Sequence, residues 1–550
     1  MTFRTKHFHS FNEFRDHVLD LYFSFHPTFA SIIGLHQYDN FIEDYSAANR
    51  NRYVEDLTEA RDILHKEFDR ISMDPTSSFE RSALSWKIDE ELFRYNSLRE
   101  FEWNPMFYNQ QVSVNHLFER DYAPLDIRSR SALLRLRAIP RVLAVARQNL
   151  LNTVDKTIVE TAIASFEGRI SYLDELPLAH LNNVTNHGLR EMLDEAVQDA
   201  KMAILSFIES MRNVLLPQAS YDSFRLGAEK MTEYLARTEL VTESIADLQE
   251  RGQREMDRLW ARMAELTREI DSAMSPEDVF RTYVESEHFS EKNLIPETES
   301  MLERIRKFLI AKNIITVPSE VRCKVAPTPA HMRWAFAAMN SPGAFEQTAT
   351  EAYYYVTPPD PKLSPEKRKE YMQGYSRSVM ELISIHEAYP GHYVHFLHLQ
   401  KARTKVGKSF WSYSFLEGWA HYTEEMMIDA GYCSGDLRIE VACVQEALIR
   451  LCRYMSALGR HAGNMTIAES QRLFEDKALL RPIAAKKEAE RSVFDPGYLF
   501  YTLGKFQIQE LRKRVEQDRG FALQSFHDEL LSYGTAPLPI VSELMLRANA

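Results

Sequence analysis

The heptapeptide HEAYPGH, residues 386–392, decides how this chain is interpreted. It holds a histidine, a glutamate and a second histidine, as the helical zinc-hydrolase motif H-E-x-x-H does. However, His386 and His392 are six positions apart instead of four. Six residues of a regular helix turn through about 600°, which leaves the two side chains about 120° apart and unable to share one metal ion. A straight helix therefore excludes a metal site here.

Pro390 and Gly391 permit a different geometry. Proline has no N–H to donate and clashes with the preceding turn, and glycine adopts backbone angles that other residues avoid, so a helix can break at this pair. If the break absorbs two residues, His392 takes the place that the second histidine has in H-E-x-x-H. We predict that the helix breaks between His386 and His392 and that both bind one ion. A regular helix over residues 380–398 would rule this site out.

A catalytic zinc site needs a third protein ligand, and Glu417 in FLEGWAHYTEEMM, residues 415–427, is the candidate. Apolar side chains on this segment recur at helical spacing and predict a face that packs in the core: Phe415, Trp419, Tyr422 and Met426. Glu417, His421 and Glu424 fall on the opposite face. We expect Glu417 to bind the metal ion and His421 and Glu424 to orient its ligands.

Each of these assignments has an alternative. The acidic and histidine face of residues 415–427 could be a solvated helix surface. His395 and His398 extend the histidine cluster, so the ligand pair His392 with His395 stays open, although packing on a helix is the more ordinary role for both. Spacing alone does not choose between these interpretations.

Two further groups have the chemistry that a hydrolase needs. Glu387 follows a ligand but points elsewhere, so it could take a proton from a metal-bound water and pass it to the leaving group. Tyr498 and Tyr501, in DPGYLFYTLGKFQIQELRKR at residues 495–514, lie nearly on one helix face. They are either core aromatics or contacts for the substrate and its oxyanion.

Composition bounds the class of protein. The chain has 550 residues, 45% of them hydrophobic, with 18 Gly and 22 Pro, which is typical of an ordered globular protein rich in helix. The net charge of −13 argues against a general binder of nucleic acid or of anionic membranes. The sequence lacks an apolar run of signal-peptide or membrane-span type, and its four cysteines show no C-x-x-C spacing, so we expect a cytoplasmic protein whose cysteines are core residues.

The organisation along the chain is mostly helical. Residues 134–154 and 229–270 carry strong helical periodicity, and Pro217 with the polar residues 218–224 interrupts it. We expect one unit over 1–550, with an N-terminal helical lobe at 1–217 and a catalytic lobe at 218–550. Between residues 315 and 360, β-branched and aromatic residues bracketed by proline and glycine predict a small sheet.

The motifs HExxPGH, EGWAxYxE and P-x-x-x-x-Y-x-x-G together resemble the bacterial domain-of-unknown-function 885 family, which is itself similar to gluzincin metallopeptidases. Residues 19–40 and 350–359 extend the resemblance over nearly the whole chain. It implies a mainly α, two-lobed gluzincin-like fold with a small β-sheet beside the metal helix. It also implies one zinc ion per chain on His386, His392 and Glu417, with Glu387 as the general base.

The resemblance suggests further roles. Tyr501 is placed as the oxyanion donor, Tyr498 as a substrate contact, and the strand Tyr353–Val356, with Tyr355, as the edge strand that pairs with an extended peptide. In RLCRYMSALGRHAG, residues 450–463, Arg453 and His461 match the family pattern and are assigned to the substrate. Two positions depart from the pattern. Ala457 replaces the expected aspartate, and His421 stands where the family has an apolar residue, so it too could contact substrate.

The leading hypothesis is a zinc-dependent hydrolase of peptide bonds in short peptides, of carboxypeptidase or dipeptidase type. The first alternative is a zinc hydrolase of non-peptide amides, such as N-acyl or modified amino acids. The second is a non-catalytic helical binding protein whose metal has four protein ligands, with His421 or His395 as the fourth. The expected partner is a short peptide or small amide, with no nucleic acid and no membrane.

Overall fold

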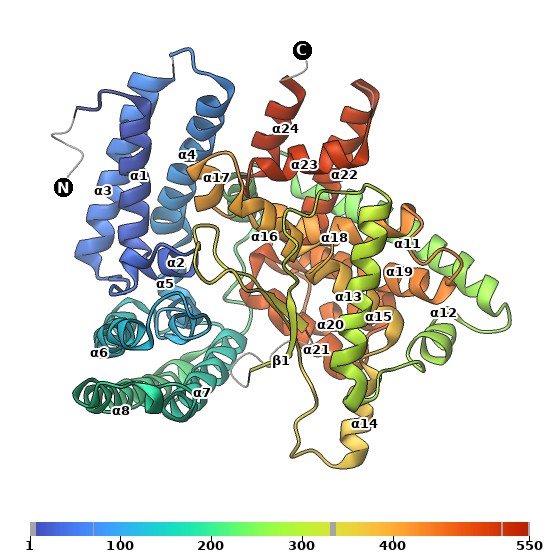
Figure 1. The fold of residues 1–550 in the computed structure, drawn as a ribbon, viewed down its shortest axis with the longest axis horizontal. Helices are drawn as coiled ribbons and strands as arrows, with labels where there is room; N and C mark the ends of the chain where they lie inside the picture. Colours follow the sequence, from blue (N-terminus) through green and yellow to red (C-terminus); the bar gives the residue numbers. More distant parts are fainter. Residues whose placement is uncertain (1–6, 70, 330–336, 519–520, 548–550) are drawn as a thin grey trace. The chain divides into compact units, whose positions relative to one another are not determined.

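A computed structural model describes residues 7–69, 71–329, 337–518 and 521–547. Within these ranges the chain is mainly helical with one small sheet, so the predicted fold class is confirmed (Figure 1). The chain divides into two compact units. Unit 1 comprises residues 1–225, 342–350 and 404–410, and unit 2 comprises residues 226–341, 351–403 and 411–550. The short segments 342–350 and 404–410 belong to unit 1, although the residues on either side of each belong to unit 2.

Unit 1 is built from two groups of helices. The helices α1, α3 and α4 pack side by side, as do α6, α7 and α8 (Figure 1). Aspartate, serine or asparagine side chains cap several of these helices by accepting a backbone N–H, which satisfies donors that the first turn leaves open. The bounds are α1 Phe11–Phe25, α2 Pro27–Ile32, α3 Ala47–Ile63, α4 Pro75–Phe93, α5 Glu100–Trp103, α6 Leu125–Asn149, α7 Lys156–Ala179, α8 His187–Ser210, α9 Leu216–Gln218 and α17 Lys405–Ser409.

Unit 2 contains the conspicuous motifs. The long helix α19 packs against α11, α20 and α15, and α18 packs along α22. The bounds are α10 Ala228–Glu239, α11 Ile245–Ile270, α12 Pro276–Val279, α13 Leu294–Ala311, α14 Pro365–Gln373, α15 Arg377–Glu387, α16 His392–Gln400, α18 Tyr413–Asp429, α19 Leu437–His461, α20 Ile467–Ala478, α21 Pro482–Phe494, α22 Phe500–Asp518, α23 Leu523–Ser532 and α24 Leu538–Arg547.

The sheet of unit 2 has three strands in the order β1 (Lys324–Pro327), β3 (Tyr353–Val356), β2 (Ala337–Asn340). β1 runs parallel to β3 and β2 runs antiparallel to it. The sequence-based placement of the strand Tyr353–Val356 at the sheet edge is therefore wrong, because both of its sides are paired. The free edges belong to β1 and β2. β2 contacts α15, so its edge is the one near the metal motif.

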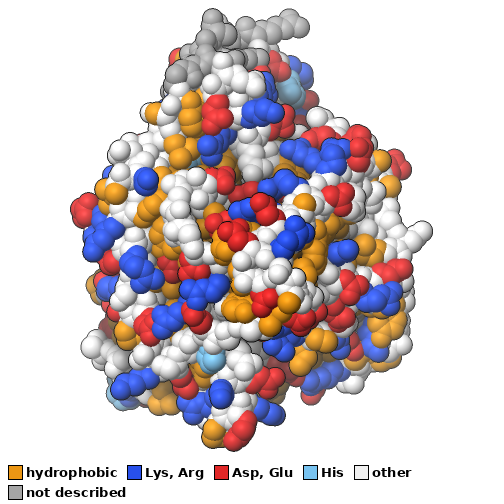
Figure 2. Space-filling view, turned by 90° about the vertical axis from the view of Figure 1, so that its right-hand side faces the viewer, with side chains coloured by type: hydrophobic (Ala, Val, Ile, Leu, Met, Phe, Trp, Pro, Cys, Tyr) orange, Lys and Arg blue, Asp and Glu red, His pale blue; other side chains and the backbone are white. Residues whose placement is uncertain are grey.

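The surface and the cysteines add two observations. On the face drawn in Figure 2, basic and acidic side chains are interspersed. None of the helices in the described ranges is sufficiently long and apolar to span a membrane. Cys323, Cys443 and Cys452 are buried, as predicted, whereas Cys433 is only half-buried and has a φ of 53° in the turn after α18. The prediction that every cysteine is a core residue is thus wrong for Cys433.

Candidate metal centre

The predicted helix break is confirmed. α15 ends at Glu387 and α16 begins at His392, with residues 388–391 between them and a cis peptide bond between Tyr389 and Pro390. Hydrogen bonding continues across the break, since the Gly391 N–H donates to the Ile385 carbonyl at 3.0 Å. The break therefore joins two helices closely enough for His386 and His392 to face one point.

Only glycine fits at position 391. A Cβ there would lie 1.7 Å from the carbonyl oxygen of His386, far inside van der Waals contact. The indole of Trp419, on α18, donates to the Pro390 carbonyl at 3.0 Å and is fully buried. The PG pair is thus packed against the helix that carries the third candidate ligand.

Two glycines let α18 and α22 approach closely. A Cβ on Gly418 would lie 2.4 Å from the Cα of Gly504, and a Cβ on Gly504 would lie 1.7 Å from the carbonyl oxygen of Ser414. Because the backbones cross here without side chains between them, Glu417 and Tyr501, each beside the crossing, reach the same region. The glycines of the EGWA and Y-x-x-G motifs therefore position the two functional candidates.

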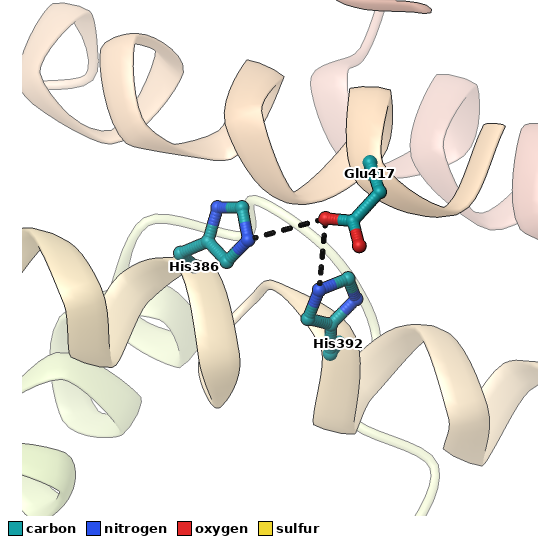
Figure 3. Close-up of side chains that lie close together, drawn as sticks. All are labelled: His386, His392 and Glu417. Carbon is teal, nitrogen blue, oxygen red and sulfur yellow. Dashed lines mark ion pairs between the residues drawn. The ribbon is translucent and has the colours of Figure 1, made fainter. Parts of the chain in front are cut away.

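His386, His392 and Glu417 form one group (Figure 3). One ligand atom from each lies within 4.8 Å of the other two. The Nε2 atoms of both histidines lie 3.5 Å from the same Oε2 of Glu417. Ligands about 2.0–2.1 Å from one ion at tetrahedral angles stand roughly 3.3–3.4 Å apart. The spacing and the donor set thus fit a zinc ion.

The group is enclosed but accessible. The side chains of His386, His392 and Glu417 are 7%, 13% and 25% exposed. Burial raises the pKa of Glu417, but polar contacts from the two imidazoles outweigh it and hold the pKa well below its usual value. Glu417 is therefore ionised, as a metal ligand must be.

A buried carboxylate orients His386. Glu424 lies 2.7 Å from His386 Nδ1, 3.2 Å from His421 Nδ1 and 3.0 Å from Arg450 Nη2. Burial alone would raise the pKa of Glu424. The positive charge of Arg450 is the largest of the opposing effects, and together they hold the pKa well below its usual value. An ionised Glu424 accepts the Nδ1 proton of His386 and leaves Nε2 free to face Glu417. The alternative of a solvated face on α18 is excluded for His421 and Glu424, which are 2% and 1% exposed.

Glu387, the predicted general base, contacts the sheet. Its Oε2 accepts the backbone N–H of Met339 at 2.8 Å. In an antiparallel strand the N–H and C=O of one residue point to the same side, so the main-chain groups of Met339 face away from β3. The carboxylate therefore lies at the free edge of β2, beside the metal ligands.

Tyr501 and Tyr498 differ in environment. Tyr501 is half-buried, and its ring stacks at 6.5 Å from that of His386. Burial, followed by the Glu417 charge, raises the pKa of Tyr501 to about 12, so its phenol keeps the proton that it would donate. Tyr498 is fully buried and donates its hydroxyl proton to Glu488. The structure brings Tyr501, but not the Tyr498 hydroxyl, toward the ligands.

The other residues that the sequence assigned to the substrate contact neighbouring protein groups in the structure. Arg453 donates through two nitrogens to the two oxygens of Glu488, at 2.8 and 2.9 Å. His461 is fully buried, and its Nε2 contacts the Ser492 carbonyl at 2.9 Å. Tyr355 is 8% exposed and stacks on Tyr353. Their assignment to substrate binding stays a prediction.

The two additional histidines lie apart from the group. His395 packs on the rings of Phe415 and Trp419, with centroids 5.1 and 6.2 Å away. His398 contacts the Thr316 carbonyl at 2.8 Å through Nε2. Among the described residues the metal group contains neither of them, nor His421. The ligand pair His392 with His395 is not what the structure brings together.

Sequence reasoning missed three contributors to this region. Arg450 neutralises Glu424, and its only sequence signal is that it lies one helical turn before Arg453. Met339 meets Glu387 through a backbone group, which leaves no signal in the side-chain pattern. Arg491, at the end of α21, lies over the Tyr498 ring at 4.5 Å, and the following DPG tripeptide was the only indication of a functional turn.

Fold and donor set define the class: a mainly helical protein with a candidate mononuclear metal centre. The chain belongs to the family described as "Bacterial protein of unknown function (DUF885)", whose model matches residues 27–545. A comparison with curated proteins gave no match.

Solved structures show the same fold. One, described as "a putative lipoprotein of unknown function" from Shewanella oneidensis, is 24% identical over 98% of this chain and 100% of its own, with a TM-score of 0.82. Another, described as "the putative lipoprotein" from Colwellia psychrerythraea, is 16% identical over 98% of this chain and 99% of its own, also with a TM-score of 0.82. An M32 carboxypeptidase from Deinococcus radiodurans R1 is 12% identical over 98% and 95%, and its TM-score of 0.42 is too low to carry an inference.

The expectation of a cytoplasmic protein is wrong. It is contradicted by the two solved structures that match the full chain, since both are described as lipoproteins. The cysteine argument fails for a physical reason. Cys323, Cys443 and Cys452 are buried, and buried thiols persist unpaired in an oxidising compartment because oxidants do not reach them. Cysteine spacing therefore does not report the compartment of this chain.

Proposed function

We propose that this protein is a zinc-dependent hydrolase of peptide bonds in short peptides, of carboxypeptidase or dipeptidase type. The observation that carries the proposal is the convergence of His386, His392 and Glu417 within 4.8 Å at a helix break. Two histidines and one carboxylate are a donor set of catalytic zinc sites, which leave a fourth position for water. The three-ligand group also argues against a structural metal site with four protein ligands.

Bound to these ligands, zinc would supply a Lewis acid and lower the pKa of a water molecule. Glu387 would take the proton from that water and deliver it to the leaving amine. The Tyr501 phenol would donate a hydrogen bond to the developing oxyanion, since its raised pKa keeps it protonated. His386 keeps its orientation through Glu424.

The free edge of β2 supports a peptide over other amides. In an antiparallel strand, the N–H and C=O groups of successive residues point alternately to the two sides. Because the Met339 N–H points away from β3, the main-chain groups of Met339 and Ala337 both face the free edge. An extended peptide that pairs with β2 would run past Glu387. The edge role assigned from the sequence to Tyr353–Val356 thus passes to Ala337–Asn340.

The test compares wild type with Glu387→Gln. We expect one zinc per chain in both proteins and peptide hydrolysis roughly 10²–10⁴-fold slower in the variant, because the proton acceptor is lost while the ligands remain. Zinc is measured by elemental analysis and hydrolysis by chromatography of a peptide panel. Glu370→Gln, an exposed glutamate on α14, is the matched control and should hydrolyse the panel at the wild-type rate.

Two results would change the proposal. Unchanged hydrolysis by folded, zinc-loaded Glu387→Gln would remove Glu387 from the mechanism. Wild-type activity on N-acyl amino acids with none on any peptide would replace the peptidase by an amidase that uses the same residues.

A further inference from the structure

A charged cluster lies near Tyr501. Its members are two arginines, two carboxylates and a tyrosine: Arg453, Arg491, Glu488, Asp495 and Tyr498. Arg453 lies 5.1 Å from the Tyr501 ring and 5.1 Å from the Tyr498 ring. The Tyr501 ring therefore neighbours both the candidate metal ligand His386 and this cluster.

The two arginines are held very differently. Arg453 makes a bidentate pair with both oxygens of Glu488 at 2.8 and 2.9 Å, and its side chain is 16% exposed. Arg491 reaches only one oxygen of Asp495, through Nε and Nη2, both at 3.3 Å. Arg491 is 37% exposed. A guanidinium has five N–H donors in a planar fork, so Arg491 retains donors for a second anion whereas Arg453 is committed to Glu488.

Packing fixes the Arg491 guanidinium on the ring of Tyr498, three residues before Tyr501 in the chain. Its Cζ lies 4.5 Å from the centre of the buried Tyr498 ring, which orients the plane of the fork. More than a third of the Arg491 side chain is exposed, so its guanidinium can be reached from solvent.

The charges around Arg491 also link it to the metal group. Asp495 is the first residue after α21 and precedes the turn Pro496–Leu499, which leads into α22 and Tyr501. Burial raises the pKa of Asp495, the charge and hydrogen bond of Arg491 lower it in part, and the nearby Glu417 charge raises it further. Asp495 is therefore close enough to interact with both Arg491 and Glu417.

We propose that Arg491 binds the terminal carboxylate of the substrate. A planar fork matches a carboxylate in two parallel hydrogen bonds, and this is the recognition for which arginine is preferred over lysine. The inference rests on the proposed peptide hydrolase and narrows it to an exopeptidase that requires a free C-terminus. A peptide whose C-terminal carboxylate meets Arg491 would present a bond close to that end to Glu387 and Tyr501.

The experiment pairs each substrate with its amide. A tripeptide panel with a varied last residue is prepared as free acids and as C-terminal amides, and kcat/KM is measured for zinc-loaded wild type, Arg491→Ala and Arg491→Lys. We expect wild type to prefer the acids. Arg491→Ala should lose about 10- to 100-fold on the acids, mostly in KM, and less than about threefold on the amides, because a hydrogen bond to a charged group is removed only for the acids. Arg491→Lys should fall between them.

Arg481→Gln is the matched control, since this exposed arginine lies at the start of the same helix and pairs with Glu285. It should leave both series unchanged. Equal losses on acids and amides in Arg491→Ala, or no wild-type preference for acids, would overturn the role of Arg491 while leaving a hydrolase in place.

Direct binding separates the two proposals. Calorimetry measures the affinity of the same acid and amide for wild type and Arg491→Ala. If wild type hydrolyses neither series but binds the acid through Arg491, the hydrolase proposal fails and the carboxylate site stands. If neither the acid nor the amide binds, both proposals fail.

Discussion

At the scale of single residues, the candidate centre depends on a carboxylate that touches no ligand atom of the metal. Glu424 is 1% exposed, and its charge is tolerable only because Arg450, His386 and His421 all contact it. Burial lowers the pKa of His421 to about 3, so this ring is neutral near pH 7 and Arg450 supplies the compensating charge. The result is a fixed acceptor for the Nδ1 proton of His386.

Replacing Glu424 should therefore weaken zinc binding. In Glu424→Gln we expect zinc affinity to fall roughly 10–100-fold, since a partner that orients a metal-binding histidine is worth about that much. Competition with a chromophoric chelator measures the affinity, and circular dichroism checks the fold. Glu446→Gln is the control, because Glu446 pairs with the same Arg450 but does not contact His386. Zinc affinity equal to wild type in a folded Glu424→Gln would show that the contact is only structural.

Sequence reasoning singled out the three residues that the structure brings together, and Glu424 and His421 beside them, but not Arg450 or Arg491. The break at Pro390 and Gly391 is a local property of the chain, and Glu417 lies on a helix with a clear apolar stripe, so spacing and stereochemistry suffice for both. Arg450 and Arg491 come from helices whose packing depends on tertiary contacts. Nothing in the sequence sets either residue apart from the other arginines near it, and only the fold distinguishes Arg491 from Arg453.

At the scale of elements, the crossing of α18 and α22 decides where Glu417 and Tyr501 lie. The two helices meet at Gly418 and Gly504, where neither backbone leaves room for a Cβ. The strands illustrate the limit of sequence patterns at this scale. The run Tyr353–Val356 predicts a strand correctly, but its place between β1 and β2 is set by pairings with distant segments.

Filling the crossing should destabilise unit 2 and displace Tyr501. In Gly504→Ala the added Cβ would lie 1.7 Å from the Ser414 carbonyl, so we expect a loss of about 1–3 kcal/mol in the free energy of unfolding, as for other overpacked sites. Thermal unfolding and peptide hydrolysis both report the effect.

Gly168→Ala is the control for that change. Gly168 lies within α7, and nothing stands within 4 Å of a Cβ added there. Alanine is the better helix former by about 0.5–1 kcal/mol, so this variant should be slightly more stable than wild type. If Gly504→Ala matched Gly168→Ala in stability and activity, the close crossing would not be needed.

At the scale of the whole molecule, each of the two units holds both a buried neutral histidine, such as His116 in unit 1, and a histidine paired with carboxylates, such as His386 in unit 2. In unit 2, burial lowers the pKa of His527 to about 3, so this histidine is buried neutral. In unit 1, His36 lies between two carboxylates, with Nε2 2.8 Å from Glu346 and Nδ1 3.2 Å from Asp39, and it stacks on Tyr122 at 3.7 Å. Glu346 belongs to the segment 342–350, which follows β2 in the chain but is part of unit 1. The His36–Glu346 pair therefore holds this segment against the rest of unit 1.

The His36–Glu346 pair should stabilise unit 1 only within a pH window. Burial lowers the pKa of His36, but the bonds and charges of Asp39 and Glu346 outweigh it and raise the pKa to about 9. Burial likewise opposes the ionisation of Glu346, yet the His36 bond and backbone N–H groups lower its pKa to about 2. The His36 contribution is thus complete below its unfolded pKa of about 6.5 and is lost as pH rises through 9. The Glu346 contribution is complete above its unfolded pKa of about 4.5 and is lost as pH falls toward 2.

His36→Gln tests this window. The variant keeps a hydrogen-bonding side chain but no charge, so its stability deficit should be greatest between about pH 4.5 and 6.5 and should shrink on both sides. We expect roughly 1–2 kcal/mol at the maximum, since solvent screens a ring that is one third exposed. Urea unfolding at a series of pH values measures the deficit, and His187→Gln, an exposed histidine of α8, should show little at any pH. A deficit in His36→Gln that stays constant from pH 5 to pH 10 would mean that packing on Tyr122, and not the ion pair, is what His36 contributes.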